Sequence, residues 1–486
     1  SERQWPCGRR STQRHHCNQK RRPVHDMTYQ TSLHPQSVAA DVEAIHAGTA
    51  LYTNPPEIEQ LLDLLDWPAC GGRLLDPGCG DGNMVVAALA RLELRPGDSL
   101  QACRVRGFEF HKPSVIEAQA RCRKLLIERG WDPWEAMRTS YTIIQQRDFL
   151  LDPPEQKWET ILANPPYWRK FRLPDAYRSQ FDQTVPPYAQ ADLLHAYLDR
   201  MMAVVTDDGR MGLITSDRWL TNAGAASIRE RIGERFCVSH AERLASESPF
   251  HRPKDRRQGS PPRVHAVSLI LGEKGQRMEK KPFLIEELPS ISGVAFTDLV
   301  DIRLAPWLGP DGIFIVEDPA ILPEADLVPC IMPKGIDPVT DTVLPTSRWA
   351  IITGDKKPHH TVMKHLSANM DRMPERGIRP VAWHPPERFD KHLPLHQEAV
   401  LIPRIAKRLR PITIPAGHLP INHSLVVASG LPASLIKSML EHPQVQKQAD
   451  ILAPRVESGY RSYTATLLRQ LVIPYEAIPS DISEAA

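Results

Sequence analysis

The strongest constraint on the fold is a regular alternation of two patterns between residues 27 and 281. Short apolar and β-branched runs predict strands, and the stretches between them have helical periodicity. The predicted strands are residues 73–76, 105–110, 141–144, 160–163, 211–215, 236–240 and 264–271, and the predicted helices lie near 82–94, 113–129, 189–206 and 224–235. Strands that alternate with helices are typical of a mainly parallel sheet with helices on both faces. We therefore predict one α/β, Rossmann-like domain over residues 27–281.

The pattern changes after residue 281. Residues 282–420 hold 20 of the 46 prolines, whereas residues 188–248 hold none. Proline lacks a backbone N–H donor and is excluded from helix interiors and central strands. We therefore expect residues 282–486 to form a second domain that is rich in loops, with short strands and few long helices.

The charges are distributed unevenly along the chain. Residues 1–26 hold seven Lys and Arg against two acids, residues 27–329 hold 34 against 42, and residues 330–486 hold 19 against 14. Residues 1–26 have almost no apolar side chains, which predicts a disordered basic arm, and the spacing of Cys7 and Cys17 matches no standard zinc site. A basic C-terminal part beside an acidic middle suggests that one part of the protein contacts a polyanion.

Membrane and secretory signals are absent from the sequence. No run approaches the roughly 18 consecutive apolar residues of a membrane span, and Arg and His stand where a signal peptide has its apolar core. We expect a cytoplasmic protein without membrane contact, and no metal site.

A glycine-rich turn follows the first predicted strand, in the segment Asp76-Pro77-Gly78-Cys79-Gly80-Asp81-Gly82. Glycines let the backbone approach a ligand closely, and the helix that follows offers unpaired N–H groups. The dinucleotide fingerprint is not met, and the two acids would repel a pyrophosphate. A plain turn between strand and helix also explains the pattern, but an uncharged or cationic nucleoside is the ligand that fits it.

Acidic residues also end the next two strands. Glu109 lies 31 residues after Gly78, and its carboxylate can accept hydrogen bonds from two ribose hydroxyls. This spacing exceeds the roughly 20 residues of dinucleotide folds, and we assign the excess to an inserted loop at residues 94–104. Asp148 is expected to accept from an adenine amino group while Phe149 covers the ring. Each acid taken alone is better explained as an ordinary surface residue.

The fourth strand ends in Asn164-Pro165-Pro166-Tyr167. An exocyclic amine is a poor nucleophile because its lone pair is delocalised into the ring, so an enzyme must hold the nitrogen nearly tetrahedral. The Asn164 side-chain oxygen and the Pro165 carbonyl can each accept one N–H, and the two prolines stiffen the loop that carries them. Tyr167 offers a ring on which a base can stack.

Together these segments resemble the amino-methyltransferases that use S-adenosylmethionine, whose motifs are D-x-G-x-G-x-G and [DNS]-P-P-[YFW]. Asn in the first place of the second motif is similar to the N6-adenine type. The segment at residues 48–57 stands before the glycine turn and is similar to the Y-T-P-P-E motif of the gamma class. This resemblance implies that Tyr52 and Thr53 contact the methionine end of the cofactor, although Asn54 is an insertion relative to the motif.

Further segments are similar to the same class. Residues 191–198 and 209–220 resemble the helix and strand that follow the NPPY motif, and Phe250 matches the aromatic residue that packs on the flipped adenine. An enlarged basic loop at residues 251–263 departs from the family pattern. Its residues Arg252, Lys254, Arg256 and Arg257 are expected to follow a phosphate strand.

Two segments of the C-terminal part, at residues 401–410 and 458–463, resemble target-recognition domains. The DNA-binding residues predicted there are Arg404, Lys407, Arg408, Arg410, Tyr460 and Arg461. Arginine can fork onto guanine or phosphate, but a solvated basic surface explains any one of these residues equally well.

The resemblance to the gamma class implies a Rossmann-like class I methyltransferase sheet at residues 27–281 and an α+β target-recognition domain at 282–486. It implies transfer of a methyl group from S-adenosylmethionine to N6 of a flipped-out adenine in duplex DNA, by a monomer with a cognate restriction endonuclease or other defence protein as partner. The implied cofactor-binding residues are Tyr52, Thr53, Asp76, Gly78, Gly80, Glu109, Phe110, Asp148, Phe149 and Asn164, and the implied catalytic residues are Asn164, Pro165, Pro166, Tyr167 and Phe250. Methylation of RNA or of a protein glutamine, and a DNA-binding module without catalysis, are the alternatives.

Overall fold

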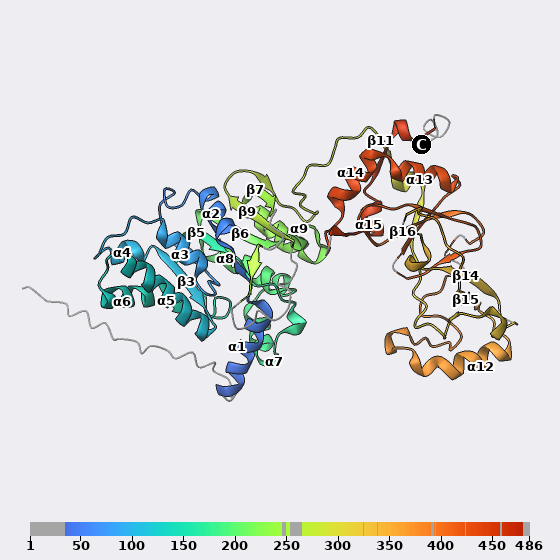
Figure 1. Cartoon of the computed structure of the whole chain (residues 1–486), viewed down its shortest axis with the longest axis horizontal. Coiled ribbons are helices and arrows are strands. Elements are labelled where there is room, and N and C mark those ends of the chain that lie inside the picture. The colour runs from blue at the N-terminus through green and yellow to red at the C-terminus, as the bar shows by residue number, and fades with distance from the viewer. Residues whose placement is uncertain are drawn as a thin grey trace, which may run out of the picture.

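The computed structural model describes residues 35–244, 249–252 and 265–479, except residues 324, 338, 390–392, 394, 423, 457 and 458. The predicted arm at 1–26 and most of the basic loop lie outside these residues. Figure 1 shows two lobes, one coloured blue to green and the other yellow to red. Their buried apolar residues form separate clusters, which divide near residues 283–285. We refer to these parts as the N-terminal and the C-terminal lobe.

An eight-stranded sheet forms the centre of the N-terminal lobe, in the order β10-β7-β9-β6-β5-β2-β3-β4. Its strands are β2 (Leu74–Asp76), β3 (Val105–Glu109), β4 (Ile144–Gln146), β5 (Trp158–Ala163), β6 (Val205–Ser216), β7 (Cys237–Arg243), β9 (Ala266–Gly272) and β10 (Gln276–Arg277). The strands from β4 to β6 are parallel, and β9 lies antiparallel between β6 and β7. The predicted α/β class is confirmed.

Helices cover both faces of this sheet. The helices are α1 (Pro35–Thr49), α2 (Pro55–Leu64), α3 (Asn83–Ala90), α4 (Ser99–Ala102), α5 (Lys112–Glu128), α6 (Pro133–Ile143), α7 (Asp175–Thr184), α8 (Leu193–Val204), α9 (Arg218–Thr221) and α10 (Ala226–Arg235). Side chains alternate between the two faces of a strand. Leu74 and Leu162 accordingly pack with α2, α3, α5 and α6, whereas Leu75 and Ile161 pack with α7, α8 and α10.

The predicted strand at residues 141–144 is wrong, because most of it belongs to α6. The Asp132 side chain accepts hydrogen bonds from the backbone N–H groups of Trp134 and Glu135, and Pro133 occupies the first turn. This start signal outweighs the β-branched residues near the end, so the helix continues to Ile143 and only Ile144 begins β4. The segment at 94–104, predicted as a loop, also contains α4.

The C-terminal lobe is built from small sheets. One contains β12 (Asp301–Leu304), β20 (Ser424–Ala428), β16 (Ala399–Pro403) and β18 (Ile412–Ile414), and another β13 (Ile315–Val316), β15 (Trp349–Ile351), β14 (Leu327–Ile331) and β19 (Leu419–Pro420). Two pairs are β11 (Gly293–Ala295) with β22 (Val472–Pro474) and β17 (Ile405–Ala406) with β21 (Arg461–Ser462). The helices are α11 (Phe296–Leu299), α12 (His360–Asn369), α13 (Ala433–Glu441), α14 (Pro443–Leu452) and α15 (Ala465–Leu468). The predicted short strands and few long helices are confirmed.

A short strand pair joins two distant segments of the N-terminal lobe. In it β1 (Tyr52–Thr53) lies antiparallel to β8 (Phe250–His251), with Thr53 opposite Phe250. Within the described residues, no helix combines the length and the apolar character that crossing a bilayer requires.

Candidate active site

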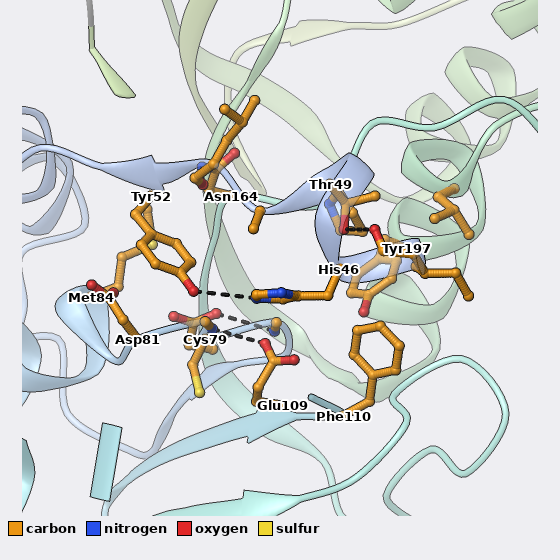
Figure 2. A pocket seen from close by; sticks show the side chains of 18 of the residues that line it. His46, Thr49, Tyr52, Cys79, Asp81, Met84, Glu109, Phe110, Asn164 and Tyr197 are labelled. Atoms are coloured by element: carbon orange, nitrogen blue, oxygen red, sulfur yellow. Dashed lines mark hydrogen bonds between the residues drawn. The ribbon is translucent and has the colours of Figure 1, made fainter. Parts of the chain in front are cut away.

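A pocket opens where the parallel strands β2, β3 and β5 end. Figure 2 shows side chains from α1, from the glycine turn and from these strand ends pointing into it. It encloses about 820 Å³, the open space at its mouth included. The predicted residues that line it are Tyr52, Thr53, Asp76, Gly78, Gly80, Glu109, Phe110, Asp148, Asn164 and Pro166. Ten residues that were predicted from separate segments therefore meet in one cavity.

The glycine turn is fitted closely against its neighbours. Gly80 has a left-handed backbone with φ of +52°, and a Cβ atom there would lie 2.6 Å from Cε1 of Tyr52. The Gly80 N–H donates to Oε2 of Glu109 at 3.0 Å, and the Gly78 N–H donates to Oδ1 of Asp76 at 3.2 Å. Only glycine fits at position 80, because the conformation and the space both exclude a side chain.

Three carboxyl groups gather in the floor of the pocket and are almost fully buried. Burial raises the pKa of Asp76 to about 8 and the pKa of Glu109 to about 7. Burial also raises the pKa of Asp81 to about 6, although Arg121 at 2.9 Å opposes this shift. Nearby positive charge favours the ionised form of such groups, so the pocket is electrostatically suited to a cationic ligand.

Glu109 keeps free acceptor capacity on both oxygens. Its Oε1 accepts from the His111 N–H at 2.8 Å and its Oε2 from the Gly80 N–H. Each carboxylate oxygen can accept a second hydrogen bond, which leaves room for two hydroxyl donors.

The Asn164 amide is held in one orientation by three hydrogen bonds. Its Nδ2 donates to the Leu51 carbonyl at 2.8 Å and to Oγ1 of Thr53 at 3.1 Å. The Tyr167 hydroxyl donates to Oδ1 of Asn164 at 2.7 Å and also lies 3.0 Å from the Ile214 carbonyl. Because both N–H donors are engaged, Oδ1 is the group that stays available to accept from a ligand.

Asp148 and Phe149 are placed differently from each other. The Asp148 carboxylate is at the pocket wall, where Oδ1 accepts from the backbone N–H groups of Leu150 and Leu151, and burial raises its pKa. Phe149 is only 1% exposed and packs on Tyr197 with ring centroids 5.5 Å apart. The predicted cover of an adenine ring by Phe149 is therefore incompatible with this arrangement, since the ring is part of the core. Phe110 is the aromatic side chain of this sheet edge that lines the pocket.

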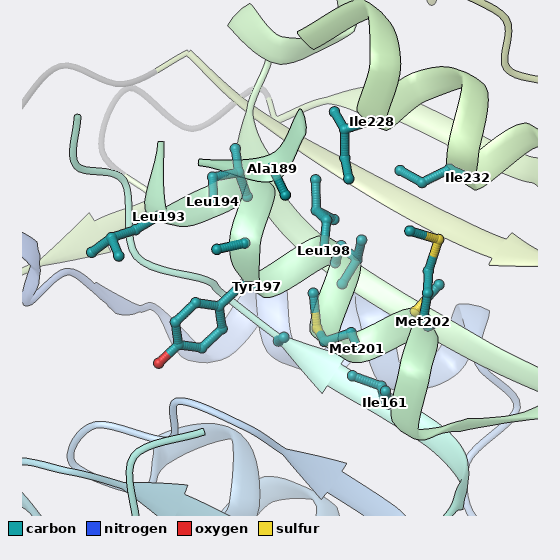
Figure 3. Packing of buried hydrophobic residues seen from close by; sticks show 14 of the residues in the cluster. Ile161, Ala189, Leu193, Leu194, Tyr197, Leu198, Met201, Met202, Ile228 and Ile232 are labelled. Atoms are coloured by element: carbon teal, nitrogen blue, oxygen red, sulfur yellow. The ribbon is translucent and has the colours of Figure 1, made fainter. Parts of the chain in front are cut away.

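Helices also contribute pocket residues that were not predicted, among them Tyr197 of α8 and His46 of α1. The apolar side of α8 packs against Ile228 and Ile232 of α10 and against Ile161 (Figure 3). The Tyr197 ring lies on another side of α8, packs on Phe149 and lines the pocket. His46 of α1 also lines it, with Nε2 at 3.4 Å from the Tyr52 hydroxyl and 3.1 Å from Oγ of Ser114. Tyr197 lies within residues 191–198, which resemble the helix after the NPPY motif, but it was not assigned to the site; His46 lies just before the motif at 48–57.

His46 is also part of a small cluster of side chains able to bind a metal ion. Its ligand atom lies within 4.8 Å of those of His111 and Glu43. The two imidazole rings are stacked at 3.6 Å, and His111 contacts Ser114 through one nitrogen and Glu43 through the other. These contacts describe a hydrogen-bonded support for the pocket wall, and no metal function is derived from them.

Phe250 is not at the pocket. It is 3% exposed and packs in the apolar cluster between the sheet and α2 and α3, because β8 pairs it with Thr53 at the back of the site. The predicted stacking of Phe250 on a flipped base is therefore not supported by its position. Arg252 is half-buried just after β8, whereas Lys254, Arg256 and Arg257 lie outside the described residues.

The predicted DNA-binding residues of the C-terminal lobe fall into two groups. Arg408 and Arg410 form ion pairs with Asp341, and Arg461 forms one with Asp450. In the second group, the ammonium of Lys407 lies 5.8 Å from the Tyr460 ring, and the Arg404 side chain makes no ion pair within the described part of the chain. Three of the six are thus engaged inside the protein, and a purely sequence-based assignment could not separate them.

Comparison with known proteins shows that part of the chain is similar to restriction-modification methylases. Residues 118–248 match the Eco57I restriction-modification methylase family. Type II methyltransferase M.PaeR7I of Pseudomonas aeruginosa is 27% identical over 284 residues, covering 55% of this chain and 47% of that protein. M.XhoI of Xanthomonas vasicola is 26% identical over 254 residues, covering 46% of each. The chain thus spans about half the length of these relatives, and the resemblance predicted from the motifs is confirmed.

A solved structure agrees in fold over most of the chain. The Type IIL restriction-modification enzyme MmeI, determined in complex with DNA, matches with a TM-score of 0.53 and 14% identity, covering 90% of this chain and 65% of that one. At this identity the match shows the fold alone, and that fold includes the C-terminal lobe.

Proposed function

From the match of residues 118–248 to the Eco57I restriction-modification methylases, we propose that this chain methylates N6 of a flipped-out adenine in duplex DNA, with S-adenosylmethionine as methyl donor. The observation that carries the proposal is the fixed Asn164 amide beside a pocket lined by Asp76, Asp81 and Glu109. The Asn164 amide alone, or the acidic pocket alone, does not indicate methyl transfer. Together they provide an acceptor for the target amine and a site for the cationic methyl donor. In this proposal residues 27–281 are the catalytic domain and residues 282–486 recognise the target.

The pocket residues fit S-adenosylmethionine by charge and by hydrogen bonding. Glu109 would accept from the ribose hydroxyls and Asp148, at the pocket wall, would accept from the adenine amino group. The buried acids suit a sulfonium and an ammonium group, and Tyr52 and Thr53 close the side next to Asn164. When bound, this cofactor supplies an electrophilic methyl group.

Asn164 is the residue that would activate the target amine. Its Oδ1 accepts one N–H of the exocyclic amine and the neighbouring Pro165 carbonyl accepts the other, which draws the nitrogen toward a tetrahedral geometry. Two consecutive prolines and the hydrogen bond from Tyr167 keep these acceptors in place before substrate arrives. Because the amino group is inaccessible inside a stacked duplex, the base must leave the helix first.

Tyr167 has a different function here from the one its sequence position suggests. Its hydroxyl is buried against Asn164 and the Ile214 carbonyl, and burial holds its pKa far above the ordinary value of a tyrosine. The phenol therefore stays protonated and acts as a donor that orients the amide. Stacking of the target base on the same ring is compatible with this contact.

Duplex DNA is favoured over RNA or a protein glutamine. Residues 330–486 hold 19 Lys and Arg against 14 acids, and the structurally similar MmeI was solved with DNA. A monomer on DNA, with a restriction endonuclease as cellular partner, is the arrangement we propose. A DNA-binding module without catalysis is disfavoured because the residues of the pocket are complete.

The test is long-read methylome sequencing of plasmid DNA from cells that express the wild type or Asn164→Ala. We expect one sequence context modified at adenine by the wild type, and activity reduced about a hundred- to thousandfold in the variant. Asn222→Ala is the matched control, since it removes an exposed amide that bonds only the Gly224 N–H at 3.3 Å. This control should be as active as the wild type.

Calorimetric titration with S-adenosylmethionine accompanies the test. A wild type that binds the cofactor but leaves DNA unmodified would contradict the proposal, and modified adenine in RNA would establish the RNA alternative. Unchanged DNA methylation by Asn164→Ala would show that the amide is not the acceptor.

A further inference from the structure

The C-terminal lobe contains a groove at one edge of its four-stranded sheet. Strands β12 and β16 both run antiparallel to β20, with Leu304 opposite Leu425 and Pro403 opposite Ser424. The carboxyl ends of β12 and β16 and the amino end of β20 therefore meet at the same edge. Leu304, Arg404 and Asn422 stand at these three ends, and all three line the groove.

The opposite wall of the groove is formed by the segment around η8 (Glu375–Gly377). Its Arg376 guanidinium lies over the Trp307 ring at 4.5 Å, and Gly377 approaches the same ring so closely that a Cβ atom would be 3.2 Å from it. A guanidinium stacked on an aromatic face keeps its N–H edges free to donate. Arg379 is exposed and completes the lining.

These arginines differ from most others in the lobe. Arg348, Arg408, Arg410 and Arg461 each form an ion pair with an acid of the protein. In the described part of the chain, Arg376, Arg379 and Arg404 form none. The one acid in the groove, Glu387, has its Oε2 engaged by the Trp307 backbone N–H at 2.9 Å. The groove therefore presents three arginines and one acid, and in the described part of the chain none of these arginines is paired with an acid.

The surroundings of the groove suit a nucleic acid rather than a free anion. Leu304 is 52% exposed at its wall, beside the arginines. An exposed apolar side chain together with arginines matches base edges and thymine methyl groups as well as phosphates. The side-chain oxygen of Asn422 has no hydrogen-bond partner in the described structure, which adds an acceptor that a ligand would satisfy.

We infer that this groove is a base-contacting site for duplex DNA, in which Arg404 recognises a guanine edge and Arg376 and Arg379 hold adjacent phosphates. We assign these different roles to Arg404 and to Arg376 and Arg379 because of where each residue lies. Arg404 is half-buried directly after a central strand, so its guanidinium is placed by a rigid element, whereas the other two are on an exposed irregular segment. The inference rests on the proposed function, because it assigns the target sequence to this edge of the lobe.

The experiment compares binding to two duplexes, one with the sequence context that the wild type methylates and one with that context scrambled. Fluorescence anisotropy at several salt concentrations separates contacts to bases from contacts to phosphates. We expect Arg404→Gln to lose about ten- to a hundredfold on the first duplex and less than about threefold on the second. Arg379→Gln should weaken binding to both duplexes alike and reduce the salt slope by about one.

Two further variants control for charge and folding. Arg303→Gln removes an arginine adjacent to Leu304 on β12 whose side chain lies on the other face and pairs with Asp301, and it should leave both affinities unchanged. Arg404→Lys keeps the charge but not the fork, so it should lose discrimination while retaining binding to the scrambled duplex. The melting temperature and the affinity for S-adenosylmethionine are measured for each variant.

The outcomes distinguish this inference from the proposed function. A wild type that methylates DNA, together with an Arg404→Gln variant of unchanged discrimination, would overturn the groove alone. Equal weakening on both duplexes with a reduced salt slope would show that Arg404 contacts only phosphate. A wild type that neither methylates nor binds DNA would overturn the proposed function and the groove with it.

Discussion

The two lobes place their functional side chains at strand ends, but they treat charge in opposite ways. In the N-terminal lobe, Asp76 and Glu109 are buried at the carboxyl ends of parallel strands, and burial raises the pKa of both. In the C-terminal lobe, Arg376 and Arg379 are exposed beside strands that are only two to five residues long. This difference suits the ligands that we propose, because a small cation can be enclosed in a buried site, whereas a DNA duplex can be contacted only at the surface.

The largest expected effect tests whether a buried arginine contributes more to the free energy of unfolding than a partly exposed one. Arg229 of α10 is 1% exposed and donates to the carbonyls of Trp219, Asn222, Lys280 and Lys281 at 2.7–3.0 Å. Arg229→Met leaves these four acceptors unsatisfied, and we expect the free energy of unfolding to fall by about 3 kcal/mol.

The matched change in the C-terminal lobe is Arg461→Met, which breaks the ion pair with Asp450. We expect a loss of about 1 kcal/mol, because solvent screens this partly exposed pair. Urea denaturation of both variants gives the two values, and equal losses would show that burial does not separate the two arginines.

An intermediate effect tests whether the close packing of Gly80 against Tyr52 is needed for the proposed binding of the cofactor. Gly80→Ala and Gly71→Ala both place alanine at a left-handed position, but only at Gly80 does the new Cβ meet Tyr52, since no atom lies within 4 Å at Gly71. Both should lose about 1 kcal/mol of stability from backbone strain. Only Gly80→Ala should also lose affinity for S-adenosylmethionine, by about thirtyfold, because Tyr52 is displaced. Calorimetry would contradict this explanation if the two variants bound the cofactor equally well.

A further effect concerns pH. Because Asp76 and Glu109 have raised pKa values of about 8 and 7 in the free pocket and a cation favours their ionised forms, cofactor affinity should rise from pH 6 to pH 7.5. The unliganded protein should show the opposite trend in stability. Its folded state keeps these carboxyls protonated while the unfolded state ionises them near pH 4, so the free energy of unfolding should fall as pH rises from about 4 to 8.

The arginine groove provides the contrast to this pH dependence. Arginine stays charged at all these pH values, so binding to DNA should be constant over the same range. Asp76→Asn should flatten most of the pH dependence of cofactor binding. An affinity that did not change with pH in the wild type would show that the acids are already ionised in the free pocket.

Much of the pocket could be predicted because its residues follow strands in short motifs. Asp76, Glu109 and Asn164 were each predicted at the end of a buried strand, and the carboxyl ends of adjacent parallel strands necessarily meet. The sequence did not show that the Phe149 ring lies in the core, because an aromatic residue next to a site residue can face either the cavity or the core. Only the packing of α8, which brings Tyr197 against that ring, decides between them.

The C-terminal lobe was less predictable for a related reason. Arg408 and Arg404 are equally basic in the sequence, and it is the loop carrying Asp341 that neutralises the first and leaves the second unpaired. Trp307 and Arg376 were not predicted at all, since 69 residues separate them and no local pattern connects them.

The sequence by itself determined the α/β class, the identity of the motif residues and their order, because strand periodicity, glycine turns and the NPPY segment are local properties. Tertiary structure alone decided which side chains point into the cavity, which arginines remain unpaired and how far the acids are desolvated. These properties depend on what surrounds a residue in space, and for Glu109, Phe149 and Arg404 the deciding neighbours are distant in the chain.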